Sequence, residues 1–341
     1  MTKKSLCGLD PEEILQLTGP DNYTREHSLS VAYNIYRKHE DNISRFIKIP
    51  ARLKEKLAGV SVAGIFKPSG SQISSDGTIK YLFENDRGLR HETVFIPDGR
   101  RNTVCVSSQS GCRMGCSFCL TGKYGFHGNL TAGEIVNQII SLPAAREVTH
   151  VVFMGMGEPM DNLEEVLKAC RIITAEWGLA LSHRNVTVST VGITPAVERF
   201  LEESDCNLAL SLHSPFEEER LEYIPAERKY PAGEIISMMK DYPLRKKRRL
   251  SVAYVMIEGI NDTDAHLEAL KSLFSGSRIR INLLPYHVAS DDSLRSSSPG
   301  RIMHFKHELV ISGISASIRR SRGEDISAAC GLLASGLKNL I

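Results

Sequence analysis

Residues 111–119 read GCRMGCSFC and place Cys112, Cys116 and Cys119 within one short loop. Thiolates are soft ligands that both iron–sulfur clusters and zinc prefer, and three sulfurs with these gaps can surround one face of a cluster. A structural zinc ion takes four ligands, and no CxxC or HxxxH partner follows in the sequence at a suitable distance. The loop therefore favours a [4Fe–4S] cluster with one open iron over structural zinc or unrelated core cysteines.

The cysteine loop follows the first of six short runs rich in β-branched residues, which alternate with longer amphipathic stretches. This alternation is typical of βα units built around a parallel sheet. The predicted strands span 103–108, 149–156, 185–192, 207–213, 250–256 and 279–285, and the predicted helices span 131–142, 162–176, 194–203, 232–240 and 263–274. Because an ordinary barrel has eight strands, this pattern predicts an α/β fold with a partial (β/α)6 barrel.

Three further regions flank the predicted barrel of residues 101–300. Residues 1–60 have the apolar spacing of amphipathic helices, which predicts a small helical accessory domain. Residues 61–100 are short segments separated by turn signals, which predict a β-hairpin extension leading into the barrel. Residues 301–341 hold one more helical stretch, a final strand at 315–321 and a loop that contains Cys330.

The composition is that of a folded protein, because 42% of its 341 residues are hydrophobic and 24% are charged. These values exclude a disordered, collagen-like or coiled-coil chain. No apolar run approaches the roughly 18 residues of a membrane span. The opening MTKKSLCGLD has no apolar signal segment after its lysines. We therefore expect a cytoplasmic protein whose eight cysteines serve metal binding, catalysis or packing rather than a disulfide scaffold.

The cysteine loop resembles that of the radical S-adenosylmethionine (SAM) superfamily, since it has Phe118 before its last cysteine and follows the first strand of a βα series. The resemblance implies that SAM chelates the open iron and is cleaved to a 5′-deoxyadenosyl radical. It also implies that Gly157 and Glu158, in FMGMGEP, hold the SAM amino group. Without the three cysteines, these two residues would be interpreted as a glycine-rich turn with a solvated glutamate.

A longer resemblance, from about residue 92 to 335, is to the RlmN/Cfr family of radical SAM RNA adenosine methyltransferases. It is carried by ETVFIP, VCVSSQSGC, CSFCLTGKYGF, VVFMGMGEPMDN, VTVSTVGITP, LALSLHSP and RRSRGEDISAACG. The implied SAM contacts are Gly157, Glu158, Ser189, Ser211, Leu212, His213 and Asn282. Each lies near the carboxyl end of a predicted strand, where α/β folds gather polar groups on a ligand. Taken singly, the serines, His213 and Asn282 would more often be capping or core residues.

The resemblance assigns chemistry to two further cysteines and one glutamate. Cys330, in AACG, matches the thiol that first receives a methyl group from one SAM, and Cys105, in VCVSS, matches its partner. A radical made from a second SAM removes hydrogen from that methyl, whose carbon then bonds to adenine. Attack by Cys105 on the Cys330 sulfur releases the methylated base and leaves a disulfide. Glu92 matches the proton acceptor. Otherwise Cys105 would be a buried strand residue, and Glu92 and His91 a solvated pair.

The resemblance also implies an RNA partner, an electron donor such as flavodoxin or ferredoxin, and a monomer. Lys and Arg number 42 against 40 Asp and Glu, so any RNA-binding surface must be local. Cations expected near the active edge are Arg87, Arg90, Arg100, Arg101, Arg319, Arg320 and Arg322. The run RKKRR at 245–249 is a further candidate, although such a run is more often a solvated turn. The accessory domain is expected to grip RNA.

The sequence departs from the family pattern at Leu120, Glu227, His287 and Leu332, so the modified carbon stays open. The leading hypothesis is methylation of adenosine carbon 2 in 23S rRNA, with tRNA as a further substrate. Methylation of carbon 8, which confers resistance to ribosome-targeting antibiotics, is the second hypothesis, and SLHSP (211–215) slightly favours it. A third hypothesis is an activase of a glycyl-radical enzyme, and a fourth is a non-catalytic iron–sulfur or zinc protein that binds RNA.

Overall fold

The central sheet of this computed structural model, which describes residues 3–19, 23–243, 247–287 and 294–334, has ten strands in the order β14-β13-β12-β11-β10-β9-β6-β5-β4-β3. The strands from β14 to β6 are parallel, and β5, β4 and β3 continue the sheet in antiparallel fashion. The parallel strands are β6 (Thr103–Cys105), β9 (His150–Phe153), β10 (Val186–Thr190), β11 (Asn207–Ser211), β12 (Leu250–Met256), β13 (Arg280–Pro285) and β14 (Ala316–Ile318). The antiparallel strands are β5 (Arg90–Ile96), β4 (Ile79–Glu84) and β3 (Gly70–Ile73).

The predicted partial barrel is confirmed, with two differences. The final strand β14 joins the parallel part of the sheet beside β13, so the parallel series exceeds the predicted six strands. The predicted hairpin is β3 and β4, and β5 connects it to β6 so that hairpin and barrel share one sheet. Among the described residues the end strands β14 and β3 do not pair, so the barrel stays open.

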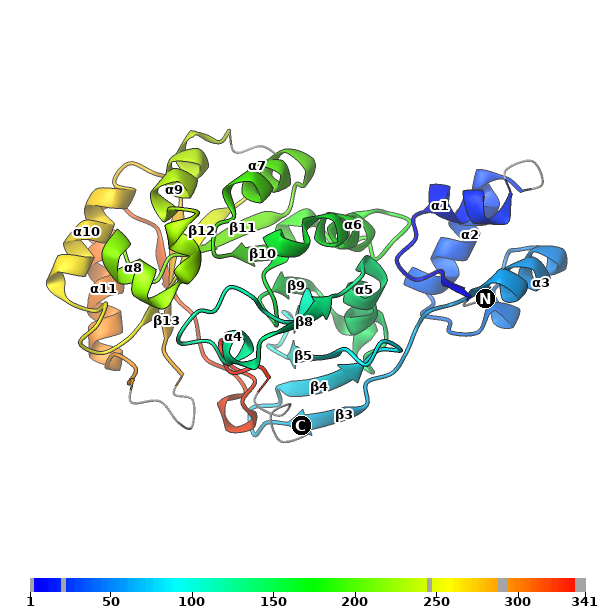
Figure 1. Ribbon diagram of the computed structural model, residues 1–341, viewed down its shortest axis with the longest axis horizontal. Helices are drawn as coiled ribbons and strands as arrows, with labels where there is room; N and C mark the ends of the chain where they lie inside the picture. The colour runs from blue at the N-terminus through cyan, green and yellow to red at the C-terminus, as the bar shows by residue number, and fades with distance from the viewer. Residues whose placement is uncertain (1–2, 20–22, 244–246, 288–293, 335–341) are drawn as a thin grey trace.

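Helices follow the strands and cover the outer face of the sheet (Figure 1). They are α5 (Ala132–Ile140), α6 (Leu163–Thr174), α7 (Thr194–Glu203), α8 (Glu217–Tyr223), α9 (Ala232–Asp241), α10 (Asp264–Phe274) and α11 (Pro299–Ile311). Short 3-10 helices span Ile43–Arg45, Ala145–Glu147, Pro159–Asn162, His183–Asn185, Pro225–Arg228 and Glu324–Ile326. Within the described residues, no helix has both the length and the apolar character needed to cross a membrane.

Strand side chains alternate between the helix-covered face and an inner face, which we call the lumen. Val188, Leu210 and Val252 are fully buried in the core beneath the helices. Their neighbours on the lumen side are small or polar. The register places Ser189 beside Ala209 and places Ala253 between Ser211 and Asn282, and partners in parallel strands point to the same face. The period-2 pattern of these strands therefore separates a packed outer face from a polar lumen.

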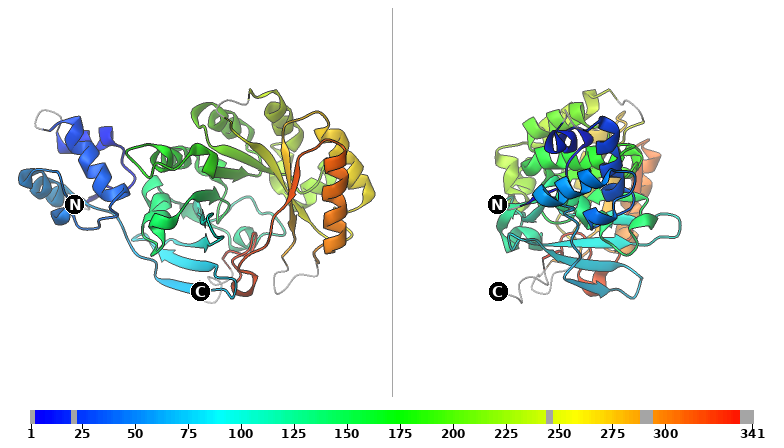
Figure 2. Two further views of the ribbon diagram at one scale, coloured as in Figure 1. Left: turned by 180° about the vertical axis from the view of Figure 1, so that it is seen from behind. Right: turned by 90° about the vertical axis from the view of Figure 1, so that its right-hand side faces the viewer.

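Residues of the accessory region form a helical lobe beside α5 and α6 (Figures 1 and 2). It comprises α1 (Pro11–Thr18), α2 (Arg25–Tyr36), α3 (Ala51–Val60) and the parallel pair β1 (Lys4–Ser5) and β2 (Ser61–Val62). Its core is continuous with that of the barrel. At the junction Gly8 meets Gly133 of α5 so closely that a Cβ on Gly133 would overlap the carbonyl of Cys7. Backbone contact between two glycines thus fixes how the lobe sits.

This contact predicts opposite effects for two glycines that occupy the same place in identical AGEI sequences. Gly133→Ala in α5 would drive a Cβ into the backbone at Cys7 and should lower the free energy of unfolding by about 1–3 kcal/mol. Gly233→Ala in α9 meets no atom within 4 Å and should leave stability unchanged or raise it by up to about 1 kcal/mol. Urea unfolding of both variants checks this, and equal effects would contradict the close packing.

Candidate active site

The cysteine loop is held between two short strands that the sequence did not predict. These are β7 (Gln109–Gly111) and β8 (Phe126–Asn129), with the short helix α4 (Leu120–Tyr124) between the last cysteine and β8. The N–H of Cys112 donates to the carbonyl of Gly125 at 3.0 Å, and the N–H of Cys119 donates to that of Cys116 at 3.1 Å. The hairpin therefore closes the loop at its base, and the loop curls on itself at its tip.

The three sulfurs lie near one another in a poorly solvated pocket of the loop. Burial raises the pKa of Cys112 to about 12, and the neighbouring charges of Glu158 and Cys119 add to this shift. Burial also raises the pKa of Cys116, with further contributions from Cys119 and Cys112. Cys116 is buried and the other two cysteines are partly buried, so thiolates at these positions are unfavourable unless a cation compensates them. The loop therefore suits a positively charged group.

Three cysteine ligands suit a [4Fe–4S] cluster, which takes one thiolate on each of three irons. Among the residues that the structure describes, no three Cys, His, Asp or Glu side chains converge on a position for a single metal ion. Zinc ligands share one ion, whereas a cubane cluster binds each cysteine through a different iron atom. Cys112, Cys116 and Cys119 can thus hold a cluster without meeting at one point, and its fourth iron would stay open.

The turn after β9 packs tightly against the strand that leads into the cysteine loop. Gly157 has φ +100°, and a Cβ there would lie 2.6 Å from the Cβ of Gln109. The N–H of Glu158 donates to Oε1 of Gln109 at 2.9 Å. Nε2 of Gln109 donates to Oδ2 of Asp161 at 2.8 Å, and Arg113 of the cysteine loop pairs with the same oxygen at 2.8 Å. This network joins the turn to the cysteine loop.

Glu158 is 3% exposed, and its carboxylate is bound by the protein itself. Oε1 accepts from the N–H of Met160 and Oε2 from the N–H of Val191, both at 2.9 Å. Burial raises the pKa of Glu158 to about 7, although these bonds and one from Thr190 oppose the shift. Glu158 therefore ties the end of β9 to the end of β10, in addition to any contact it makes with SAM.

The structure brings several predicted SAM contacts together on the lumen. The Oγ atoms of Ser189 and Ser211 are 3.4 Å apart, and Ser317 donates to Oδ1 of Asn282 at 2.9 Å. Leu212 differs, because its side chain is buried in the core beneath the helices. Its backbone alone can face a ligand in the lumen.

His213 connects the end of β11 to the cysteine loop. Its Nδ1 accepts from the N–H of Val255 at 3.0 Å, so its proton is on Nε2. Burial lowers its pKa to about 3, and the charge of Arg220 acts in the same direction. The ring packs edge-on against Phe118, with the ring centroids 5.0 Å apart. A neutral imidazole thus supports the loop between its second and third cysteines.

A buried ion pair between Arg220 and Glu227 supports these strand ends from behind. Arg220 donates to the carbonyls of Val191 at 2.6 Å, Leu212 at 3.1 Å and Ser211 at 3.1 Å. Glu227 also accepts from the N–H of Ala232 at the start of α9. Glu227, one of the departures from the family pattern, is therefore a structural partner of Arg220.

Cys105 shares an apolar cluster with Ala328, Leu333 and Ala334, the residues on either side of Cys330, although 224 residues separate the two cysteines in the chain. Burial raises the pKa of Cys105, and the neighbouring Cys330 sulfur adds to the shift. Cys330 is solvent accessible, yet protein crowds its thiol, and this desolvation raises its pKa. The nearby Cys119 raises this pKa further, and Arg319 opposes the increase. The predicted methyl-carrying thiol therefore lies near both its predicted partner and the third cysteine of the loop.

Backbone hydrogen bonds fix the Cys330 segment against α4. The N–H of Leu120 donates to the carbonyl of Gly331 at 2.8 Å, and Oγ1 of Thr121 donates to that of Leu333 at 3.1 Å. Leu120 also packs against Ala329 and Leu332. The departures at Leu120 and Leu332 are thus in contact with each other.

The β3–β4 hairpin holds the same segment from the other side. Oδ1 of Asp325 accepts from Ser74 at 2.5 Å, and its Oδ2 accepts from the N–H of Ser75 at 3.0 Å. Oδ2 of Asp76 accepts from the N–H of Gly323 at 3.0 Å. Burial opposes the ionisation of Asp76, but hydrogen bonds to Thr78, Gly323 and Ser74 outweigh it and lower its pKa to about 2. The hairpin extension therefore acts as a clamp on the Cys330 loop.

Glu92 is buried rather than part of a solvated pair with His91, so that interpretation is wrong. Its Oε1 lies 3.3 Å from Nζ of the buried Lys80, and its Oε2 accepts from the N–H of Ala334 at 2.6 Å. Val94 pairs with Cys105 in the β5–β6 register. Glu92 lies two residues before Val94, so its side chain points to the same face of the sheet. The carboxylate therefore lies beside the Cys330 segment, where a proton acceptor would be needed.

Three of the predicted RNA-facing cations form ion pairs with carboxylates. Arg87 pairs with Glu134, Arg90 with Glu84 and Arg322 with Asp98.

In the run 245–249, positions 245 and 246 lie outside the described residues. Arg248 is 5% exposed and donates to the carbonyls of Cys206 and Leu201, so it is a core residue. Arg249 is exposed.

Comparison with known proteins shows which family has this fold. Residues 106–270 match the Radical SAM superfamily. A protein of Parabacteroides distasonis, named a probable dual-specificity RNA methyltransferase RlmN, is 44% identical over 97% of this chain and 96% of its own length. The chain belongs to the RlmN family. A similarly named Porphyromonas gingivalis protein is 42% identical and is aligned over 96% of each chain.

A solved structure agrees with this membership. The crystal structure of a radical SAM methyltransferase from Sphaerobacter thermophilus superposes with a TM-score of 0.90 and 37% identity, over 97% of this chain and 99% of that one. As a member of the RlmN family, the chain is a radical SAM RNA methyltransferase. This membership decides against the activase and against a non-catalytic protein. Gln109, Arg113 and Asp161 were missed as site residues, although Gln109 and Asp161 lie within the motifs that carried the resemblance.

The cluster assignment predicts that Cys112→Ala, Cys116→Ala and Cys119→Ala each abolish the brown chromophore after anaerobic reconstitution, because two thiolates cannot retain the cubane. Cys170→Ala, in a buried position of α6, should keep full iron content. Iron and sulfide analysis measures both outcomes. A triple variant that still binds four irons per chain would disprove the assignment.

The clamp predicts that Asp76→Ala and Asp325→Ala loosen residues 323–334, since each substitution removes hydrogen bonds worth about 1 kcal/mol apiece. Amide exchange there should accelerate about tenfold or more while the iron content stays normal. Asp98→Ala removes only an exposed pair with Arg322 and should change exchange little. The stabilisation from Asp76 is present above its ordinary pKa of 3.8 and should be lost as the pH falls toward 2. Uniform exchange in all variants would contradict the clamp.

Proposed function

We propose that this protein methylates carbon 2 of an adenosine in 23S rRNA, and an adenosine of tRNA as well, through a methyl group carried on Cys330. The observation that carries the proposal is that Cys105 packs in one apolar cluster with residues on both sides of Cys330, while the same segment is bonded to α4 directly after the cysteine loop. The RlmN name of the relatives and the words "dual-specificity" in it support two RNA substrates. [4Fe–4S] and SAM are the cofactors that the superfamily implies.

Cys330 is suited to carry the methyl group because the residue is solvent exposed while α4 holds the backbone of its neighbours Gly331 and Leu333. Its sulfur attacks the methyl carbon of one SAM, and S-adenosylhomocysteine leaves. Cys112, Cys116 and Cys119 would hold the cluster, which would supply the electron that splits a second SAM into methionine and a carbon radical. That radical removes a hydrogen atom from the methyl on Cys330, and the methylene carbon bonds to the adenine ring. The adduct then gives up one proton to a base and one electron, which the oxidised cluster would take back.

Cys105 completes the reaction. Its thiolate attacks the Cys330 sulfur, an S–S bond forms, and the bond between that sulfur and the methylene carbon breaks. The released carbon takes up a proton and becomes the new methyl group. In this proposal Glu92 accepts the ring proton, a role supported by the hydrogen bond of its carboxylate to Ala334 in the Cys330 segment. Lys80, which is also buried, pairs with that carboxylate at 3.3 Å.

Carbon 8 is the second candidate position, and SLHSP is the sequence feature that favours it. Mass spectrometry of rRNA and tRNA from a deletion strain distinguishes the two positions. Loss of 2-methyladenosine supports the proposal. Loss of 8-methyladenosine, with 2-methyladenosine retained, overturns it.

The two cysteines act in sequence, so their variants should differ. Cys330→Ala should carry no protein-bound methyl group and release no methylated RNA. Cys105→Ala should still be methylated on Cys330 and should remain covalently attached to RNA, because no thiol can break the thioether.

A denaturing gel of each protein purified from cells, with and without ribonuclease, measures the adduct. Cys206→Ala, with a buried thiol at the start of β11, is the matched control and should form no adduct. Turnover by Cys105→Ala without a ribonuclease-sensitive adduct would refute the role of Cys105.

A further inference from the structure

Five exposed arginines gather at one end of the barrel and have no role in the proposed chemistry. We call this group the arginine crescent; it consists of Arg101, Arg184, Arg249, Arg280 and Arg319. Arg184 lies just before β10, Arg249 directly before β12, and Arg280 is the first residue of β13. These positions are the amino-terminal ends of parallel strands. The crescent therefore lies mainly at the edge opposite to the strand ends that carry the predicted SAM contacts.

The sheet register directs the crescent into the lumen. Arg280 pairs with Ser251 and shares its face, which is also the face of Asn282. The β11–β12 ladder extends to Arg249, whose carbonyl accepts from Leu208 and whose N–H donates to Asn207, so Arg249 shares the face of Ser251. These two arginines therefore form the lower rim of the lumen that holds Ser189 and Asn282.

Within the part of the chain that the structure describes, no paired carboxylate balances the positive charge of the crescent. Nη2 of Arg249 donates to the carbonyl of Arg184 at 3.1 Å, and Nε of Arg280 donates to the hydroxyl of Ser315 at 3.1 Å, so their partners are neutral. Burial lowers the pKa of Arg249, and the charges of Arg280, Arg101 and Arg184 lower it further. No described carboxylate forms an ion pair with a crescent arginine, in contrast to Arg87 and Arg90.

Arg319 connects the crescent to the reacting thiol. Its N–H donates to the carbonyl of Leu283 at 2.9 Å, directly after β14. Burial lowers its pKa, and Arg101, Arg280 and Arg249 lower it further. Its charge also acts on Cys330, as noted above. The β13–β14 register pairs Ser317 with Asn282, so Arg319, two residues after Ser317, points to the same lumen face.

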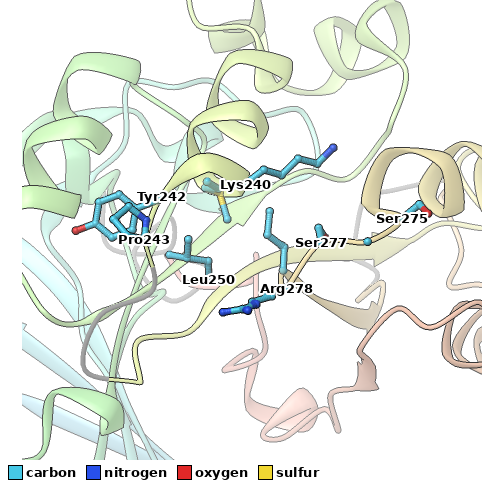
Figure 3. Close-up of a pocket in the computed structure, with 10 residues that line it drawn as sticks. Lys240, Tyr242, Pro243, Leu250, Ser275, Ser277 and Arg278 are labelled. Carbon is cyan, nitrogen blue, oxygen red and sulfur yellow. The ribbon is translucent and has the colours of Figure 1, made fainter.

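A pocket on the outer side of the same edge extends the basic surface. Its volume is about 310 Å³, and it lies between the end of α9 and the loop before β13 (Figure 3). Lys240 and Arg278 line it from these two elements, together with Leu250, which follows Arg249. Positive side chains thus lie on both sides of the strand ends.

We propose that the arginine crescent is the phosphate-binding rim through which the RNA strand presents its target adenosine to the lumen. This inference rests on the proposed RNA methyltransferase activity. Guanidinium groups bind phosphate oxygens in a bidentate manner, and such contacts position RNA without reading its sequence. The base itself must leave its stack to reach Cys330, and phosphates held on the rim would orient it toward the lumen.

An acidic electron-donor protein is the other polyanion to consider, but the placement disfavours it. The cysteine loop follows β7 at the carboxyl edge of the barrel, whereas Arg249 and Arg280 lie at the amino edge. A donor bound to the crescent would be separated from the cluster by the lumen. RNA must enter that lumen, so the crescent fits RNA better.

The test compares two double variants with the same loss of charge. Arg249→Gln/Arg280→Gln removes two crescent charges, and Arg171→Gln/Arg199→Gln removes two exposed charges from α6 and α7. The probe is a fluorescent fragment of 23S rRNA that contains the methylated adenosine. The crescent variant should bind it about tenfold or more weakly, and the slope of log K against log salt should fall by about 1.5–2. The helix variant should match the wild type.

Retention of charge provides a further control. Arg249→Lys/Arg280→Lys should keep most of the salt slope, because it preserves the two positive charges. In the wild-type enzyme, RNA should protect Arg249 and Arg280, but not Arg199, from phenylglyoxal. That measurement does not depend on how the variants fold.

Two results would overturn the inference, and a third would overturn the proposed function instead. Equal affinity and salt slope for the two glutamine variants would exclude the crescent from RNA binding. A loss of rate confined to a protein reductant, absent with dithionite and with RNA affinity unchanged, would assign the crescent to the electron donor. If the wild type methylates no RNA, the proposed function fails. If it does so while the crescent variants behave normally, only the crescent is wrong.

Discussion

The Cys330 segment docks across the start of α4, and the geometry of the site depends on this contact. Because α4 begins directly after Cys119, one short helix anchors both the cysteine loop and the Cys330 segment. The contact combines a backbone hydrogen bond from Leu120 to Gly331 with apolar packing of Leu120 against Leu332. A displacement of about 1 Å between reacting groups can cost two orders of magnitude in rate. The distance between the two reacting centres is therefore set locally, while the β3–β4 hairpin keeps the segment from lifting away.

This contact also gives physical meaning to the departures from the family pattern. Leu120 and Leu332 are in one small apolar cluster, so each is the packing partner of the other. Glu227 neutralises the buried Arg220, which holds the carbonyls at the ends of β10 and β11. His287 bonds to Ser321 at 2.8 Å, just before the Cys330 segment. Breaking a buried ion pair by removing one partner commonly costs about 3–5 kcal/mol, so Glu227 is constrained by Arg220 rather than by the substrate.

Most of the barrel could be predicted from the sequence, because its strands combine β-branched residues with period-2 alternation and its helices are amphipathic. The short elements β7, β8 and α4 could not, since their hydrogen bonds come from the cysteine loop and from the distant Gly331 rather than from local propensity. The resemblance alone identified Cys105 and Cys330 as a pair. The β5–β6 register and the docking of the Cys330 segment on α4 explain how two residues so far apart in the chain lie near each other. The burial of Glu92 and the network of Gln109, Asp161 and Arg113 depend on tertiary neighbours such as Lys80, which no spacing rule reveals. Nor does net charge reveal the crescent, because acidic residues elsewhere balance it.

The central claim is that Cys105 and Cys330 form one reacting pair beside the cysteine loop. Its most direct test is peptide mapping by mass spectrometry, under non-reducing conditions, after a single turnover with RNA and without added thiol. The account predicts one disulfide-linked pair of peptides, containing Cys105 and Cys330, for each methyl group transferred to RNA. Methylated RNA accompanied by free thiols at both positions, or by a disulfide that involves Cys112, Cys116 or Cys119 instead, would contradict it.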